Sequence, residues 1–325
     1  MTQLHRGREG GLKMVQSRKV QDILIRNSSL VFLLLLLVFN VLFTNGFVSI
    51  QTLWNMVIQI APVVLVALGM TFVISSGGID ISVGSAMAIS GMLVVQLLTK
   101  IGLIPAFLAG LVAGGILGAI NGIMISTFHI QPIIVTLGTQ IAGRGIAQLI
   151  GNGYILRFDS ESLMNIAAKR LGGIPIQLLY LVLLVALFLF IAKKTVFARY
   201  VEAMGDNYKA SWISGVKVVK VTISLYVVSA LMSSLAGILT VARAGAADPD
   251  TIGSGLELTA IAAVAIGDTK MAGGKAKVIG TILGAVILQL VSITFNMNNV
   301  PYEWSLAAKT FIIILAVFLQ NIRGD

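Results

Sequence analysis

The 325-residue sequence contains no cysteine and only two histidines. Without cysteine, disulfide and thiolate chemistry are excluded, and thiol redox state says nothing about the compartment. His5 and His129 stand too far apart to suggest a metal site, and no Ser, His and Asp set with a catalytic pattern occurs. These absences argue against an enzyme, and we predict that the chain carries neither a metal nor a cofactor of its own.

Charged residues are also scarce. They make up 11% of the chain, against about 25% in a typical soluble domain, while 57% of residues are hydrophobic and the mean hydropathy is +0.96. From Ser28 to Leu156 only Asp80, Lys100 and Arg144 are charged. The net charge of +10 could suggest nucleic acid, but the basic residues flank apolar runs, as the positive-inside rule and anionic lipids explain better. We therefore predict a membrane protein with no nucleic-acid partner.

The apolar runs predict an all-α, polytopic bundle of transmembrane helices. A crossing needs about 20 mostly apolar residues, and two weaker runs, Pro132–Ile150 and Leu256–Gly267, favour discontinuous or re-entrant helices. About ten crossings are expected if both weak runs cross, and eight if they do not. The eight clear spans are Ser28–Phe43, Trp54–Ser76, Ile79–Leu98, Leu103–Phe128, Ile176–Ala192, Val219–Val241, Val278–Phe295 and Ser305–Gln320.

Lys and Arg residues predict the orientation. The tail up to Asn27 and the Lys193–Lys220 loop carry six each, and Asp268–Lys277 carries three, whereas the Ala244–Glu257 loop has none and carries three acidic residues. Placing the basic segments inside puts both termini in the cytoplasm. We therefore expect a basic cytoplasmic tail, residues 1–27, followed by a single transmembrane domain, residues 28–325, whose first apolar run is retained because no small-residue cleavage site follows it.

One cytoplasmic loop contains a polar, amphipathic segment, Ala198–Val216. Asn207 can cap a short helix there, and Gly215 can end it in the left-handed conformation. Tyr208 and Trp212, four residues apart, then share a face that could be presented to a partner. The alternative is a helix that lies on the lipid headgroups.

Two charged residues, Asp80 and Arg144, lie within the predicted spans of the first half of the chain. Asp80 follows Gly77 and Gly78, which break the preceding helix, so its carboxylate can cap the next helix; a proton or ligand site is the alternative, since a mid-span Asp costs about 2.5–3.5 kcal/mol. Arg144 should face protein or water, and a carbonyl or carboxylate partner is favoured over a substrate.

Residues 273–275, G-G-K, resemble a phosphate-binding loop only superficially. Thr269 stands where the first glycine of that motif belongs, and Ala276 follows Lys275 in place of Ser or Thr. We therefore expect ATP hydrolysis, if it is used, on a separate polypeptide.

Three motifs resemble the permease subunits of bacterial ABC importers for monosaccharides, the ribose, xylose and galactofuranose branch. The resemblance runs from about residue 45 to the C-terminus. The motifs are G-M-T-F-V-I-S-S-G-G-I-D-I-S-V-G-S (Gly69–Ser85), I-Q-P-I-I-V-T-L-x4-A-G-R-G-I-A-Q-L-I (Ile130–Ile150) and E-A-M-G-D-N-Y-K-A-S-W-I-S-G-V (Glu202–Val216).

This resemblance implies a bacterial inner-membrane location and three partners: a second permease copy or homologue, an ABC ATPase that binds ATP and Mg, and a periplasmic or lipid-anchored sugar-binding protein. It implies that the third motif docks on the ATPase, through Glu202, Ala203, Gly205, Asn207, Tyr208, Ala210, Trp212 and Gly215. It places the first motif near the translocation path, with Gly77, Gly78, Asp80, Ser82 and Gly84. Residues 267–276 depart from the family pattern G-G-x-S-x-x-G-G-R-G, so we carry over no role for that loop.

The predicted function is therefore import of a neutral monosaccharide, a pentose or hexose with furanoses among the candidates, by alternating access driven by the partner ATPase. Few intramembrane charges fit a neutral polyhydroxy solute, which hydroxyls, amides and helix breaks would contact. An ATP-independent secondary transporter of a small polar solute is the alternative. By polarity and position, the candidate substrate contacts are Gln59, Ser82, Thr136, Gln140 and Asn296.

Overall fold

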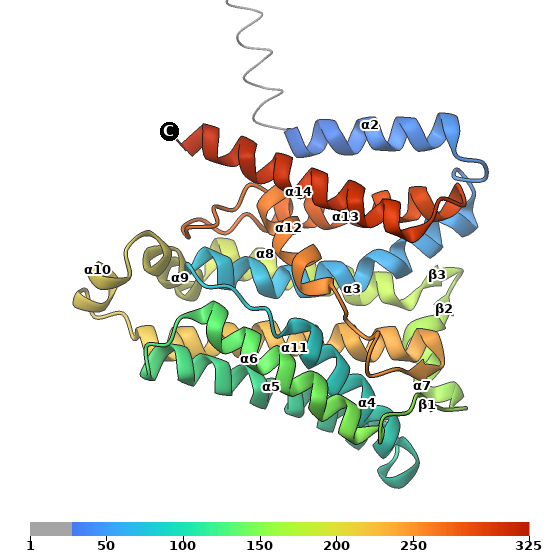
Figure 1. The fold of residues 1–325 in the computed structure, drawn as a ribbon, viewed down its shortest axis with the longest axis horizontal. Helices are drawn as coiled ribbons and strands as arrows, with labels where there is room; N and C mark the ends of the chain where they lie inside the picture. The colour runs from blue at the N-terminus through green and yellow to red at the C-terminus, as the bar shows by residue number, and fades with distance from the viewer. Residues whose placement is uncertain (1–27, 325) are drawn as a thin grey trace, which may run out of the picture.

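A computed structural model describes residues 28–324, which form a bundle of long helices (Figure 1). The predicted tail, residues 1–27, lies outside the described residues. The first half contains α2 (Ser28–Phe43), α3 (Ile50–Ser75), α4 (Val83–Ile101), α5 (Leu103–Thr127), α6 (Pro132–Ile150), β1 (Leu156–Arg157), α7 (Glu161–Ala168), β2 (Arg170–Leu171) and β3 (Ile174–Pro175). The second half contains α8 (Ile176–Lys194), α9 (Val196–Asp206), α10 (Tyr208–Ile213), α11 (Val218–Ala244), β4 (Ala246–Ala247), α12 (Leu256–Ile266), α13 (Val278–Met297) and α14 (Tyr302–Gly324).

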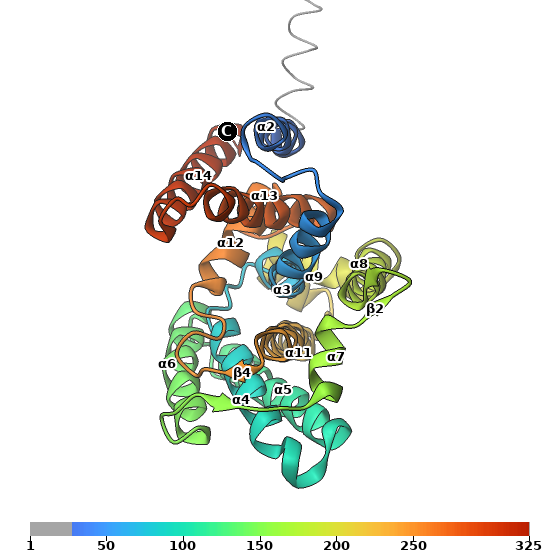
Figure 2. The ribbon, with the colours of Figure 1, turned by 90° about the vertical axis from the view of Figure 1, so that its right-hand side faces the viewer.

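Helices α3 and α11 form the centre of the bundle, with the other long helices around them (Figure 2). The last fifteen residues of α3, from Ala61 to Ser75, are all buried. Helix α11 packs most extensively on α5, because a stripe of small residues on α5 lets the backbones approach closely. At Gly118, for example, a side chain would overlap the carbonyl oxygen of Tyr226.

The two ends of the bundle differ. One end carries α9 and α10, and the other carries α7 and four two-residue strands (Figure 1). There β1 pairs antiparallel with β4, with Leu156 opposite Ala247, and β2 pairs with β3, with Arg170 opposite Pro175. We call these the α9–α10 end and the strand end; the positive-inside rule predicts that the first faces the cytoplasm. The predicted all-α architecture is confirmed, since the strands are confined to these two short pairs.

Seven helices within the described residues are long and apolar enough to cross a membrane: α3, α4, α5, α6, α8, α11 and α13. Helices α2 and α12 are shorter, with 16 and 11 residues. All ten predicted apolar segments are helical, but the number of crossings, ten or eight, stays a prediction.

Of the two forms predicted for Pro132–Ile150, discontinuous or re-entrant, the first is wrong, because α6 is one uninterrupted helix of 19 residues; the second stays a prediction. Its charge and glycines suggested a break. However, Arg144 donates from one terminal nitrogen to the carbonyl oxygens of Pro249 and Ile252, both at 2.7 Å, so the protein itself solvates the guanidinium. Gly138 and Gly145 face open space and impose no bend.

Candidate functional site

The chain turns sharply between α3 and α4, where the first motif lies. Helix α3 ends at Ser75, and Gly77 takes a left-handed φ of +83°, which favours glycine. Asp80 is 1% exposed, and its Oδ1 accepts hydrogen bonds from the Ser82 backbone N–H at 3.0 Å and the Ser82 hydroxyl at 2.6 Å. Its Oδ2 accepts from the Ser229 hydroxyl of α11 at 2.8 Å. Asp80 therefore stabilises the turn that leads into α4 but does not cap the helix as predicted, because the N-cap residue is Ser82 and no side chain at that position makes a capping hydrogen bond.

The same turn is held by further polar contacts. Asn121 of α5 donates from Nδ2 to the Ser82 hydroxyl oxygen at 2.8 Å, and the Tyr226 hydroxyl of α11 donates to the Ile79 carbonyl at 3.4 Å. Asn121 and Ser82 are fully buried. Both carboxylate oxygens of Asp80 are thus occupied by the protein, which supports a structural role for the turn.

Two candidate substrate contacts on α6 also bond within the protein. Gln140 Oε1 accepts from the Ser85 backbone N–H at 2.8 Å and so satisfies a free amide at the start of α4. The Thr136 hydroxyl donates to the Pro132 carbonyl at 2.9 Å. Thr136, Gln140 and Ser82 lie between α4 and α6, away from the cavity described next.

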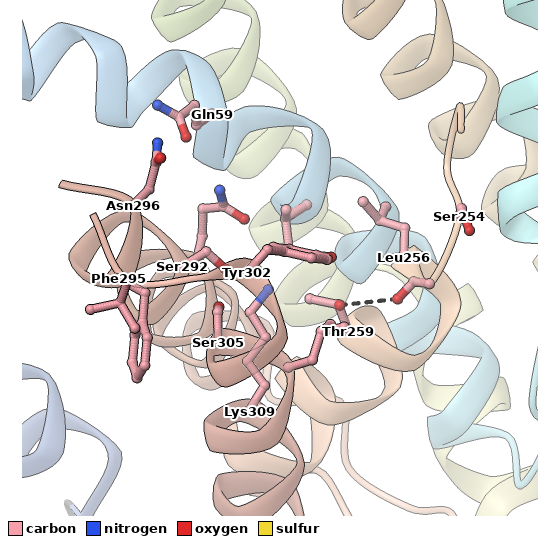
Figure 3. A pocket seen from close by; sticks show the side chains of 15 residues that line it. Gln59, Ser254, Leu256, Thr259, Ser292, Phe295, Asn296, Tyr302, Ser305 and Lys309 are labelled. Carbon is pink, nitrogen blue, oxygen red and sulfur yellow. Dashed lines mark hydrogen bonds between the residues drawn. The ribbon is translucent and has the colours of Figure 1, made fainter. Parts of the chain in front are cut away.

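A cavity of about 390 Å³ lies among α3, α12, α13 and α14 (Figure 3). Its volume lies within the range of about 300–1,000 Å³ typical of small-molecule sites. Gln59 of α3 and Asn296 of α13, both predicted from the sequence, line it together. The other polar lining residues were missed: Ser254, Thr259, Gln289, Ser292, Tyr302, Ser305 and Lys309.

A helical pattern could have found most of these missed residues. Gln289, Ser292 and Asn296 follow one another at spacings of three and four, which places them on one face of α13. On α14, Tyr302, Ser305 and Lys309 repeat the same spacings. Two polar stripes in otherwise apolar helices therefore face a common space.

Two residues of the cavity, Ser305 and Lys309, bear most directly on what it could bind. Ser305 is 1% exposed, and its hydroxyl has no hydrogen-bond partner among the described residues. A buried polar group left without a partner costs about 1–3 kcal/mol. Lys309 is half-buried and forms no ion pair with any described residue. The cavity thus offers hydroxyls, amides and one cation to a polar solute.

The polar segment at the opposite end forms two helices, α9 and α10. Asn207 Oδ1 accepts from the Ala210 backbone N–H at 2.9 Å, and Gly215 takes a φ of +85° just beyond α10. Tyr208 and Trp212 are 43% and 63% exposed on the outside of this segment.

The predicted coupling residues divide into two groups. Ala203, Asn207, Tyr208, Ala210, Trp212 and Gly215 are exposed. Glu202 and Gly205 instead face the protein: Glu202 Oε1 accepts from the Ala276 backbone N–H at 3.3 Å, and Gly205 contacts the end of α3.

Comparisons with known proteins agree over most of the chain. Residues 52–317 match the family described as branched-chain amino acid transport system / permease component. The chain is 32% identical to a ribose import permease protein of Haemophilus influenzae, covering 93% of this chain and 94% of that protein. It is 35% identical to a galactofuranose transporter permease protein of Escherichia coli, covering 81% and 77%, and 32% identical to a fructose import permease protein of Bifidobacterium longum, covering 90% and 86%. No solved structure matches the chain.

Proposed function

We propose that this chain, which belongs to the branched-chain amino acid transport system / permease component family, is the membrane-spanning subunit of an ABC importer for a neutral monosaccharide. Its relatives named above are permeases for ribose, galactofuranose and fructose. The observation that carries the proposal is the cavity among α3, α12, α13 and α14, because its side chains suit a neutral polyhydroxy solute.

Amide and hydroxyl side chains can both donate to and accept from sugar hydroxyls. Gln59, Gln289 and Asn296 supply amides, and no carboxylate is among the residues that line the cavity. Lys309 can donate up to three hydrogen bonds to hydroxyl oxygens while its charge repels cationic solutes. The unpartnered hydroxyl of Ser305 would gain its missing partner from a bound sugar.

Energy would come from a separate ATPase subunit that binds ATP and Mg and docks on α9 and α10. The exposed Tyr208 and Trp212 support docking, since exposed aromatic residues are enriched where proteins bind each other. A periplasmic or lipid-anchored binding protein would deliver the sugar at the strand end, and a second permease copy or homologue would complete the conduit. The assembly would span the inner membrane with both termini of this chain in the cytoplasm.

Reconstitution into proteoliposomes tests this proposal against the alternative, a secondary transporter. Vesicles that contain this chain, its ATPase and its binding protein should take up a labelled monosaccharide from a panel of pentoses and hexoses, only with internal ATP and in a vanadate-sensitive manner. Uptake by this chain alone, driven by an ion gradient and indifferent to ATP, would contradict the proposal.

A further inference from the structure

Three backbone segments meet at the α9–α10 end with no side chain between them. They are Gly205 of α9, Ser75 at the end of α3, and Gly273–Gly274 in the loop between α12 and α13. The Gly274 N–H donates to the Ser75 carbonyl oxygen at 2.8 Å. A side chain at Gly205 would overlap both the Ser75 carbonyl and the Gly274 nitrogen.

The loop reaches this position through unusual backbone conformations. Gly273 and Gly274 have φ values of +105° and +111°, which side chains other than glycine rarely allow. A Cβ at Gly273 would lie 2.7 Å from the Gly205 Cα. Glu202, one turn earlier on α9, adds the hydrogen bond to Ala276. We call this contact of Gly205, Ser75 and residues 273–276 the glycine joint.

Three of the four helices that line the cavity connect to the glycine joint. Helix α3 ends there and carries Gln59, and the loop connects α12, which carries Thr259, with α13, which carries Asn296. Close-packed protein has low compressibility and transmits strain, and at the joint the backbones themselves are in direct contact. A displacement of α9 would therefore act directly on the end of α3 and on the loop between α12 and α13, and thereby on three of the four helices that line the cavity.

We propose that Gly205 is a positioning residue for transport, distinct from the docking residues Tyr208 and Trp212. The inference rests on the proposed function. The glycine joint keeps α9, the end of α3 and the α12–α13 loop together as one rigid unit during the transport cycle. Movement imposed on α10 by the ATPase is thereby delivered to α3, α12 and α13, which reshapes the cavity.

A covalent bridge tests the rigidity directly, and the absence of cysteine makes the labelling specific. Glu202 and Lys275 line the same hollow beside the joint, so the double variant Glu202→Cys/Lys275→Cys can be joined by a short cleavable bifunctional thiol reagent. In the complete reconstituted transporter, sugar uptake should remain close to that of the same variant before bridging. Loss of uptake on bridging, restored by cleavage, would show that the two segments slide and would overturn the proposal.

A second cysteine pair is the positive control: its bridge joins two helices that we expect to move relative to each other during transport. Gln59→Cys/Asn296→Cys joins α3 to α13 at one edge of the cavity, where the two side chains lie near each other (Figure 3), and its bridging should stop uptake.

Gly205→Ala separates docking from transmission. The methyl group would push the Ser75 carbonyl and the loop away from α9, so the ATPase should still co-purify and hydrolyse ATP while uptake falls about tenfold or more, the usual scale of coupling between sites. The matched control is Gly138→Ala, a helical glycine with nothing within 4 Å, which should transport normally.

The outcomes are distinguishable. If the unaltered transporter shows no ATP-driven uptake, the proposed function is wrong. If the unaltered transporter shows ATP-driven uptake and Gly205→Ala transports equally well, the proposed role of Gly205 is wrong. If Gly205→Ala does not accumulate in membranes, the effect of bridging on uptake by Glu202→Cys/Lys275→Cys decides whether the joint is rigid.

Discussion

Asp80 accepts a 2.8 Å hydrogen bond from Ser229, 149 residues further along the chain, and thereby fastens the turn between α3 and α4 to the middle of α11. Both residues are buried. The turn follows directly on Ser75, which belongs to the glycine joint. The end of α3 is therefore held by two contacts. The polar turn attaches it to α11 in the core, and the glycine joint attaches it to α9.

Replacing Asp80 should destabilise the fold more than replacing any one of its hydrogen-bond partners. Asp80→Ala leaves the Ser82 N–H and the hydroxyls of Ser82 and Ser229 without their acceptor, and a buried polar group left unsatisfied costs about 1–3 kcal/mol. We expect a clearly lower midpoint of thermal unfolding in detergent, with a smaller loss for Ser229→Ala. Ser224→Ala, an exposed serine of the same helix whose hydroxyl bonds only the Lys220 carbonyl, is the control. A wild-type midpoint for Asp80→Ala would refute the stabilising role of Asp80 in the turn.

Docking on α10 should depend on its exposed aromatic side chains. The double variant Tyr208→Ala/Trp212→Ala removes the two anchors from the surface, so the ATPase should no longer co-purify and uptake should be lost, while the permease keeps its unfolding midpoint. Truncating an aromatic anchor at an interface commonly costs about 2 kcal/mol or more. Trp304→Ala, which removes a 65% exposed tryptophan of α14, serves as the control. Undiminished association and uptake would favour the alternative, an α10 that rests on lipid headgroups.

Ser305→Ala should separate stability from transport. Because the Ser305 hydroxyl is buried without a partner, its removal relieves a desolvation cost of about 1–3 kcal/mol, and the unfolding midpoint should stay the same or rise. Sugar uptake should fall, since the cavity loses a donor and acceptor. Thr310→Ala, an exposed neighbour bonded to the Leu306 carbonyl, should change neither. A stability loss with normal uptake would mean that the hydroxyl serves the fold and not the solute.

Lys309 should matter for its hydrogen bonds and its charge. Lys309→Met keeps the apolar stem but removes the donors, and loss of one to two hydrogen bonds to a solute would slow uptake about 5–50-fold. Lys309→Arg retains charge and donors and should recover part of the rate. Initial rates at saturating binding protein, with assembly checked by co-purification, measure both variants. Equal rates for the Met variant and the unaltered protein would remove Lys309 from the path.

The apolar helices and the two ends of α10 are the parts of the structure that the sequence predicted correctly. Mean hydropathy and run length predicted all ten apolar helices, because a bilayer demands local apolar length whatever the packing. The cap at Asn207 and the left-handed Gly215 were also predictable, because both depend on neighbours within a few residues.

Tertiary structure decided the rest. The sequence could not tell that Gln140 bonds to α4 while Asn296 faces the cavity, since both are amides in apolar helices. Nor could it separate Gly205, enclosed against Ser75 and Gly274, from the exposed residues beside it. Local chemistry determines where helices form and how they are capped. Which polar group meets solute, and which glycine meets backbone, depends on distant segments converging, and a linear pattern does not contain that information.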